Sequence, residues 1–273
     1  MDQNQSSVCG RKMKTESVMN PFLSYDELYF AVFDGPPSSI SQITVDLLLS
    51  ASLSVHRTQV EFDIRYSYVM HPKRPPHPSW RSSQFLFWEP TTRPGCTVMM
   101  SNVARSDQPY VGYIATHFEG RVAFAAFHRD LDPPTFYFDY YDDFGKTKRN
   151  VAIGQEDNGK WGFFVGGEIQ SFEEPSNYRK RRIADRLNQD LIQRYFDRIG
   201  FDISADEFWD STSKAWLIWD DRSGRRSHPG REGVDPYGTF ARWLPELEPP
   251  PQAGVTIRYQ GGRAQVTHRP PKK

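Results

Sequence analysis

Cysteine is scarce in this chain, which has only Cys9 and Cys96 among its 273 residues. The two stand far apart and at no spacing typical of metal ligands, which excludes a cysteine-rich zinc site. A chain of this length buries enough apolar surface to fold without disulfides. Because so few cysteines are typical of proteins in reducing compartments, we expect a cytoplasmic location.

Long apolar runs are also missing. The longest, around Leu47 to Leu49, is interrupted by Asp46 and Ser50, whereas a membrane-spanning helix needs about 20 apolar residues in succession. The first twenty residues are polar and contain no apolar core of a secretory signal. We therefore expect no membrane association and no export.

The sequence lacks the common catalytic motifs. It has no Gly-x-Ser-x-Gly elbow, no phosphate loop ending in Gly-Lys-Ser/Thr and no Gly-x-Gly-x-x-Gly after a strand. None of the seven histidines has another at the spacing of paired metal ligands, so we expect no metal and no cofactor. His128, followed by Asp130 and Asp132 at a strand end, is the best candidate for a general base, although a structural role at a strand-to-loop junction is favoured.

Aromatic residues, in contrast, are abundant, and they predict an aromatic-rich core. Alternating or continuous apolar runs predict strands at Leu28–Phe33, Val60–Tyr68, Phe85–Trp88, Thr97–Met100, Val122–Phe127, Thr135–Tyr141, Val151–Gln155, Trp161–Val165 and Lys214–Trp219. Asn158-Gly159 is a strong signal for a tight hairpin between two of them.

Helical spacing and capping residues predict one helix near 107–119 and a helix pair near 176–199, of which the second helix begins after Asn188 and ends before Gly200. Strands, one helix, more strands, a helix pair and a last strand indicate an α+β fold with a mainly antiparallel sheet.

Charge divides the chain into three parts. The segment 222–273 carries ten Lys and Arg against four Asp and Glu, so its net charge of +6 balances a net charge of −6 on the residues before it. We expect a flexible N-terminal arm over 1–20, a single domain over 21–221 and a proline-rich basic tail over 222–273. Within the tail, Gly261-Gly262 predicts a hairpin over 255–267 that pairs Tyr259 with Ala264.

An acidic, tyrosine-rich segment is the best candidate for a binding surface. It comprises Tyr137, Asp139, Tyr140, Tyr141, Asp142 and Asp143. Its three carboxylates are suitable ligands for a divalent cation, but their spacing matches no calcium loop, and a solvated turn before Gly145 explains them better. Tyrosines beside acids also form good contact surfaces for a basic partner, an interpretation that we favour over a metal site.

Basic and tryptophan-rich segments give weaker signals. The run Arg179, Lys180, Arg181, Arg182 and Arg186 can neutralise phosphates, but a solvated helix face explains it better, so we do not expect nucleic-acid binding. Trp209, Trp216 and Trp219 are more consistent with core packing than with a stacking site.

One family resemblance rests on a set of separated residues. They are Gly159 to Phe164, Gly167, Phe172-Glu173-Glu174, Tyr178-Arg179, Arg182 to Leu187 and Ile199-Gly200. Over about residues 85–200 this pattern resembles that of uncharacterised bacterial proteins associated with polymorphic or contact-delivered toxins, which are candidate immunity proteins. The resemblance implies a non-enzymatic protein that binds and neutralises a cognate toxin, and it assigns no catalytic residue. The alternative is a metal-dependent hydrolase or another enzyme.

Overall fold

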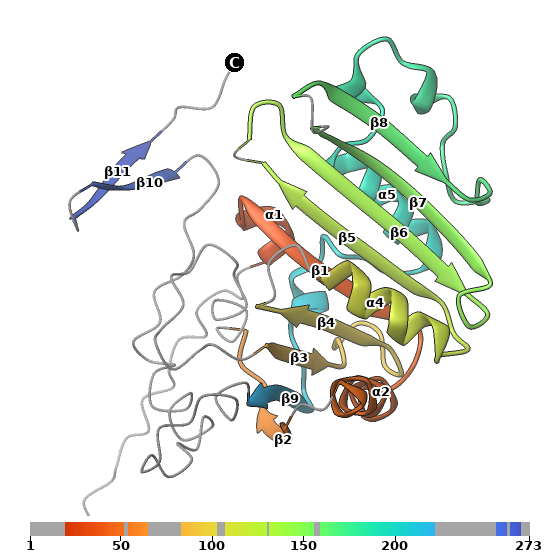
Figure 1. Cartoon of the computed structure of the whole chain (residues 1–273), viewed down its shortest axis with the longest axis vertical. Coiled ribbons are helices and arrows are strands. Elements are labelled where there is room, and N and C mark those ends of the chain that lie inside the picture. Colours follow the sequence, from red (N-terminus) through yellow and green to blue (C-terminus); the bar gives the residue numbers. More distant parts are fainter. Residues whose placement is uncertain are drawn as a thin grey trace, which may run out of the picture.

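A large antiparallel sheet organises the protein. The computed structural model describes residues 20–51, 54–64, 83–102, 107–129, 131–155, 159–221, 255–260 and 263–268. Within these residues, nine strands form one sheet in the order β2-β9-β3-β4-β1-β5-β6-β7-β8 (Figure 1). The strands are β1 (Glu27–Phe33), β2 (Ser54–Glu61), β3 (Gln84–Trp88), β4 (Thr97–Ser101), β5 (Val122–His128), β6 (Thr135–Asp142), β7 (Thr147–Gln155), β8 (Trp161–Gly166) and β9 (Lys214–Asp221).

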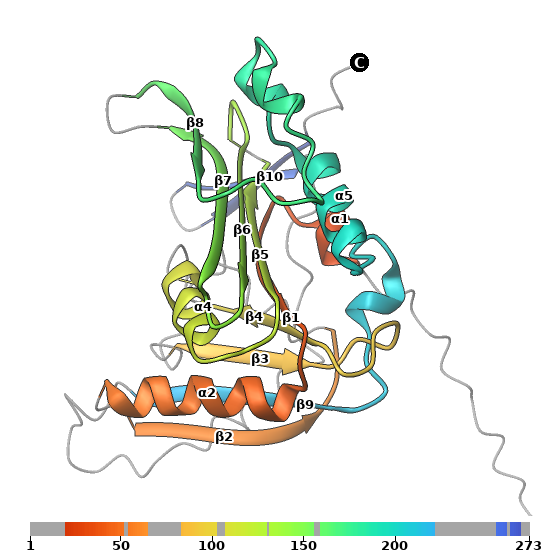
Figure 2. The same cartoon turned by 90° about the vertical axis from the view of Figure 1, so that its right-hand side faces the viewer.

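Helices cover the sheet on both sides, as Figure 2 shows for α4 and α5. On one side lie α2 (Pro37–Ser50) and α4 (Asp107–Thr116), and on the other α1 (Pro21–Ser24) and α5 (Gln189–Ile199), with 3-10 turns η1 (Asn177–Arg179), η2 (Ile183–Asp185) and η3 (Asp206–Trp209) elsewhere along the chain. Each side has its own buried apolar cluster. Because both faces are covered, every residue of β1, β3, β4 and β5 is buried, which explains their nearly continuous apolar sequences.

The α+β class and the mainly antiparallel sheet are confirmed, as are most of the predicted strands. The predicted hairpin joins β7 and β8, but its last pair is Gln155 with Trp161, so the loop spans residues 156–160 and not the two residues predicted; Gly159 in this loop has the positive φ that favours glycine. In the tail, β10 (Val255–Gln260) and β11 (Arg263–His268) pair Tyr259 with Ala264, the predicted register. The predicted arm over 1–20, apart from Asn20, and the tail over 222–254 lie outside the described residues.

Three local predictions differ from the structure. The strand predicted at Val60–Tyr68 is wrong over residues 62–64: β2 occupies Ser54–Glu61, while Phe62 and Ile64 leave the sheet and pack against the core, and residues 65–68 lie outside the described residues. Helix α2 was not predicted, because it lacks a side-chain cap and buries Ser41 and Thr44 beside Ile40 and Leu48. The first helix of the predicted pair is reduced to η1 and η2, separated by extended backbone at Lys180 and Arg182.

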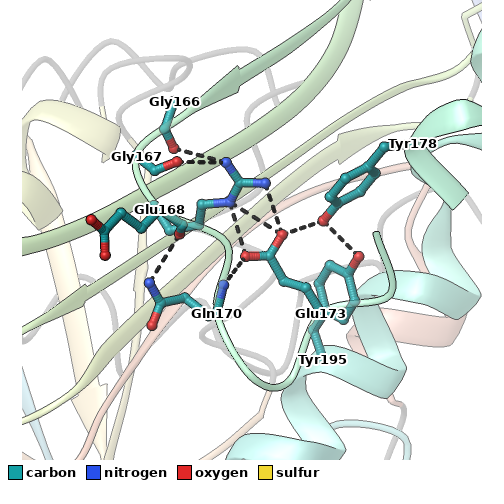
Figure 3. Close-up of polar contacts among 8 residues, drawn as sticks. Gly166, Gly167, Glu168, Gln170, Glu173, Tyr178 and Tyr195 are labelled. Atoms are coloured by element: carbon teal, nitrogen blue, oxygen red, sulfur yellow. Dashed lines mark hydrogen bonds and ion pairs between the residues drawn. The ribbon is translucent and has the colours of Figure 1, made fainter. Parts of the chain in front are cut away.

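A buried ion pair ties the segment after β8 to the sheet (Figure 3). The Arg149 guanidinium on β7 donates to both carboxylate oxygens of Glu173 at 2.9–3.1 Å, and to the carbonyls of Gly166 and Gly167 at 3.2 and 3.0 Å. The two side chains are only 2% and 0% exposed. The Tyr178 hydroxyl also donates to Glu173, and burial together with this carboxylate raises the pKa of Tyr178.

We expect Glu173→Gln to lower the free energy of unfolding by about 3–5 kcal/mol, because it leaves the Arg149 charge buried without a counter-charge. Glu174→Gln is the matched control, since Glu174 pairs with the half-exposed Arg194 and Arg198 and its loss should remove about 1 kcal/mol or less. Urea unfolding of both variants measures the difference. Equal destabilisation would show that the buried pair is no more important than the surface pair.

Candidate functional site

The structure does not bring the six predicted binding residues to one exposed surface. Side chains alternate along β6, so Asp139 and Tyr141 lie on the α4 side while Tyr140 lies on the α5 side. Tyr140 and Tyr141 are only 6% and 4% exposed, and Asp139 is fully buried. Tyr137 and Asp142 are half-buried, and only Asp143 is exposed. The prediction that these six residues form one exposed binding surface is thus wrong, because both faces of β6 are covered.

Asp139 serves as an acceptor inside the sheet. It accepts hydrogen bonds from the Asn150 amide at 2.6 Å and from the Tyr141 hydroxyl at 3.4 Å. Burial, and secondarily Asp139, raise the pKa of Tyr141, so this hydroxyl remains a donor. Because Asp142 lies beside Tyr140, the three carboxylates do not converge. In the described ranges no group of three His, Cys, Asp or Glu side chains is placed to hold a metal ion.

Tyr141→Ala should therefore act on stability rather than on binding alone. Removing a ring packed in the α4 cluster should lower the free energy of unfolding by about 3 kcal/mol, and Tyr141→Phe, which removes only the hydroxyl, by about 1 kcal/mol. Chemical unfolding of the two variants tests this order. If Tyr141→Ala is as stable as the wild type, the ring is not part of the core.

The turn between β6 and β7, residues 142–146, holds an aromatic side chain that the sequence analysis missed. Asp143 and Phe144 both have positive φ, 48° and 56°, and Phe144 is 43% exposed. This backbone region is unfavourable for a bulky residue, by roughly 1–2 kcal/mol. The turn is held by an Asp143–Lys146 ion pair and rests against Thr116 at the end of α4. It thus presents an aromatic ring to solvent directly after the two carboxylates of Asp142 and Asp143.

Most of the exposed large apolar side chains belong to the β5–β8 half of the sheet or to its connecting segments. Of the large hydrophobic residues exposed in the described chain, five lie between the β5–β6 loop and the segment after β8, namely Leu131, Phe144, Phe164, Val165 and Ile169, and two lie elsewhere, Leu23 and Leu49. We call these five residues the β6–β8 margin. Figure 1 shows β7 and β8 without a described helix in front of them. These side chains do not form one patch, since Leu131 and Phe144 lie beyond opposite ends of β6, and Phe164 and Val165 are consecutive residues of β8 that point to opposite faces.

A pocket opens on the α4 side of the sheet, at the other end of β6. Its volume is about 360 Å³, and it is lined by Tyr29, Phe124, Ala126, His128, Leu131, Thr135, Tyr137 and Gln155. The register across β1, β5 and β6 places Glu27 beside His128 and His128 beside Thr135. The predicted candidate His128 therefore lies in a cavity, next to residues from three strands. Asp130 lies outside the described residues.

His128 belongs to a compact hydrogen-bonded group. Its Nε2 lies 2.5 Å from the Tyr29 hydroxyl, and its Nδ1 lies 3.2 Å from Glu27 Oε1, to which Tyr29 also donates at 3.1 Å. Three contacts need three protons, which are present together only when both ring nitrogens of His128 are protonated. The group can therefore hold a proton between Glu27, His128 and the pocket-lining Tyr29.

Most of the basic run is exposed to solvent, whereas the tryptophan-rich segment contributes to the core. Arg179, Lys180, Arg181 and Arg182 are exposed, and Arg186 packs over the Phe163 ring. Trp209 is fully buried in the core.

Comparison with protein-family models, with curated proteins and with solved structures gave no significant match for this chain. Among the helices within the described residues, none is long and apolar enough to cross a membrane.

Proposed function

We propose that the protein binds a cognate bacterial toxin in the cytoplasm and neutralises it. The observation that carries this proposal is the exposed Phe144, held in an unfavourable backbone conformation directly after Asp142 and Asp143. Strained, exposed residues concentrate at functional sites, where the surrounding structure maintains them. The family resemblance of residues 85–200 adds support, because it implies the same role.

The chemistry of the turn favours a partner with a basic surface. Aromatic side chains at the centre of an interface contribute much of its binding energy, while charges at the rim mainly set the association rate. Phe144 supplies the ring, and Asp142 and Asp143 supply the acidic rim, of which Lys146 neutralises a part.

Phe144→Asn is the most direct test, because asparagine tolerates a positive φ and the ring is removed. We expect the variant to lose about thirtyfold or more in affinity for the toxin encoded by the neighbouring gene, while its melting temperature stays the same or rises. Calorimetric titration with the purified toxin and thermal melting give the two readouts.

Leu49→Asn is the matched control, since it removes another exposed apolar side chain, from α2, outside the margin. It should bind the toxin as the wild type does and protect cells equally when both genes are expressed. If Phe144→Asn binds with unchanged affinity, the turn is not the interface. If the neighbouring genes encode no toxin, the proposal that the protein neutralises a cognate toxin is contradicted.

A second candidate function rests on the Glu27, His128 and Tyr29 group. We propose, as the alternative, an enzyme in which Tyr29 exchanges a proton with a substrate in the pocket and His128 takes up or returns that proton. Glu27 orients the imidazole through Nδ1 and balances its charge. This arrangement needs no metal ion to move the proton.

Under the enzyme alternative, His128→Gln and Tyr29→Phe should each reduce turnover about a hundredfold or more. A panel of chromogenic nitrophenyl esters, phosphates and glycosides provides the assay, with His117→Gln, an exposed histidine outside the pocket, as control. Turnover that survives both substitutions, or no turnover of any substrate, would contradict an enzyme at this site. If the protein instead acts by binding a toxin, His128→Gln should neutralise that toxin as the wild type does.

A further inference from the structure

We infer that the His128 pocket binds a small, uncharged aromatic ring that carries an amide or hydroxyl group. The pocket combines three aromatic side chains, Tyr29, Phe124 and Tyr137, with hydrogen-bonding groups on His128, Thr135 and Gln155. Ligand sites are typically concave, mainly apolar cavities of 300–1,000 Å³ with a few placed polar groups. At about 360 Å³, this cavity has the size of a site for a small ring.

Thr135 provides an independent observation that points to a ligand. The residue is only 5% exposed, and its hydroxyl oxygen has no hydrogen-bond partner among the described residues. A buried hydroxyl without a partner is unfavourable by roughly 1–3 kcal/mol. Thr135 lines the cavity and pairs with His128 across the strands, so its hydroxyl belongs to the wall of the pocket.

The charges around the pocket favour an uncharged ligand. Of the eight described lining residues, none is Lys or Arg, so an anion finds no permanent positive charge. His128 is paired with Glu27, which lies behind it and outside the lining, so the pair adds little net charge. A cation, in turn, finds no carboxylate among the eight described lining residues. Amide and hydroxyl groups suit such a site, because they both donate and accept.

Three probes of one shape test the inference: benzamide, the cation benzamidine and the anion benzoate. We expect benzamide to bind the full-length protein with a dissociation constant of about 1 mM, as suits a ligand of this size, and the two charged probes to bind at least fivefold more weakly. Titrations followed by amide chemical shifts measure the affinities. They also locate the site, and the changes should centre on Phe124, Ala126 and Thr135.

Thr135→Val tests the orphan hydroxyl, because it removes the oxygen and keeps the shape. Benzamide should bind at least fivefold more weakly, and the melting temperature should stay the same or rise, since no described hydrogen bond is lost. Thr58→Val makes the same change on β2, far from the pocket in strand order, and should bind benzamide normally.

Two results would overturn the inference. One is binding of benzamidine or benzoate as tight as that of benzamide. The other is a set of chemical-shift changes that lie away from the pocket. Both are measured on the wild-type protein, so the test stays valid even if Thr135→Val is unstable. The inference rests on neither proposed function, because ring binding needs only the cavity. Phe144→Asn should bind benzamide like the wild type, so a failed pocket and a failed toxin interface give different results.

Discussion

The buried Arg149–Glu173 ion pair fixes the path of the chain after β8, and the packing of one side of the sheet depends on that path. Charges this deeply buried are tolerated only when their remaining donors and acceptors are also satisfied. Here the main chain meets that requirement, since Gly166 and Gly167 accept from Arg149, and the Gln170 amide donates to Glu173. The segment must therefore turn sharply after β8. At Gly167 a Cβ atom would lie 1.8 Å from the Lys148 carbonyl, and φ is +76°, so only glycine suits this turn.

Because this segment is fixed, α5 and the chain leading to it stabilise the sheet from one side. The Tyr178 hydroxyl lies 2.8 Å from that of Tyr195 on α5, so the polar network continues directly into the aromatic core. Tyr195 and Phe196 then pack on Phe138 of β6. On the opposite side, α4 contacts β5 and β6, and Thr116 at its end lies against Gly145 in the β6–β7 turn. The α5 side of the sheet therefore contributes mainly to stability. The pocket lies on the α4 side, and the exposed β6–β7 turn lies against the end of α4.

The sequence predicted what depends on local chemistry. Continuous apolar runs located the central strands, and Asn188 and Gly200 located α5, where the cap hydrogen bond and a φ of 96° are found. Long-range pairing was not predictable in this way. Residues 29 and 128 meet only because β1 lies beside β5, an order that no local pattern specifies. Likewise, the alternation of side chains along β6 places Tyr140 and Tyr141 on opposite faces of the sheet, but no local pattern indicates that both faces are covered and both rings buried. The signal for Phe144 was present as an apolar residue between Asp143 and Gly145.

The β6–β7 hairpin connects the two candidate sites physically. Thr135 begins β6 and Phe144 follows its end, so the sites lie roughly 25 Å apart along an extended strand. A partner that buries about 800 Å² on this protein covers a region of similar width. A toxin centred on Phe144 would thus approach the pocket without filling it, whereas one centred on the middle of the hairpin would cover both. Since the buried ion pair and α5 stiffen the hairpin from behind, direct overlap, rather than a change in strand geometry, is the simplest way for one site to affect the other.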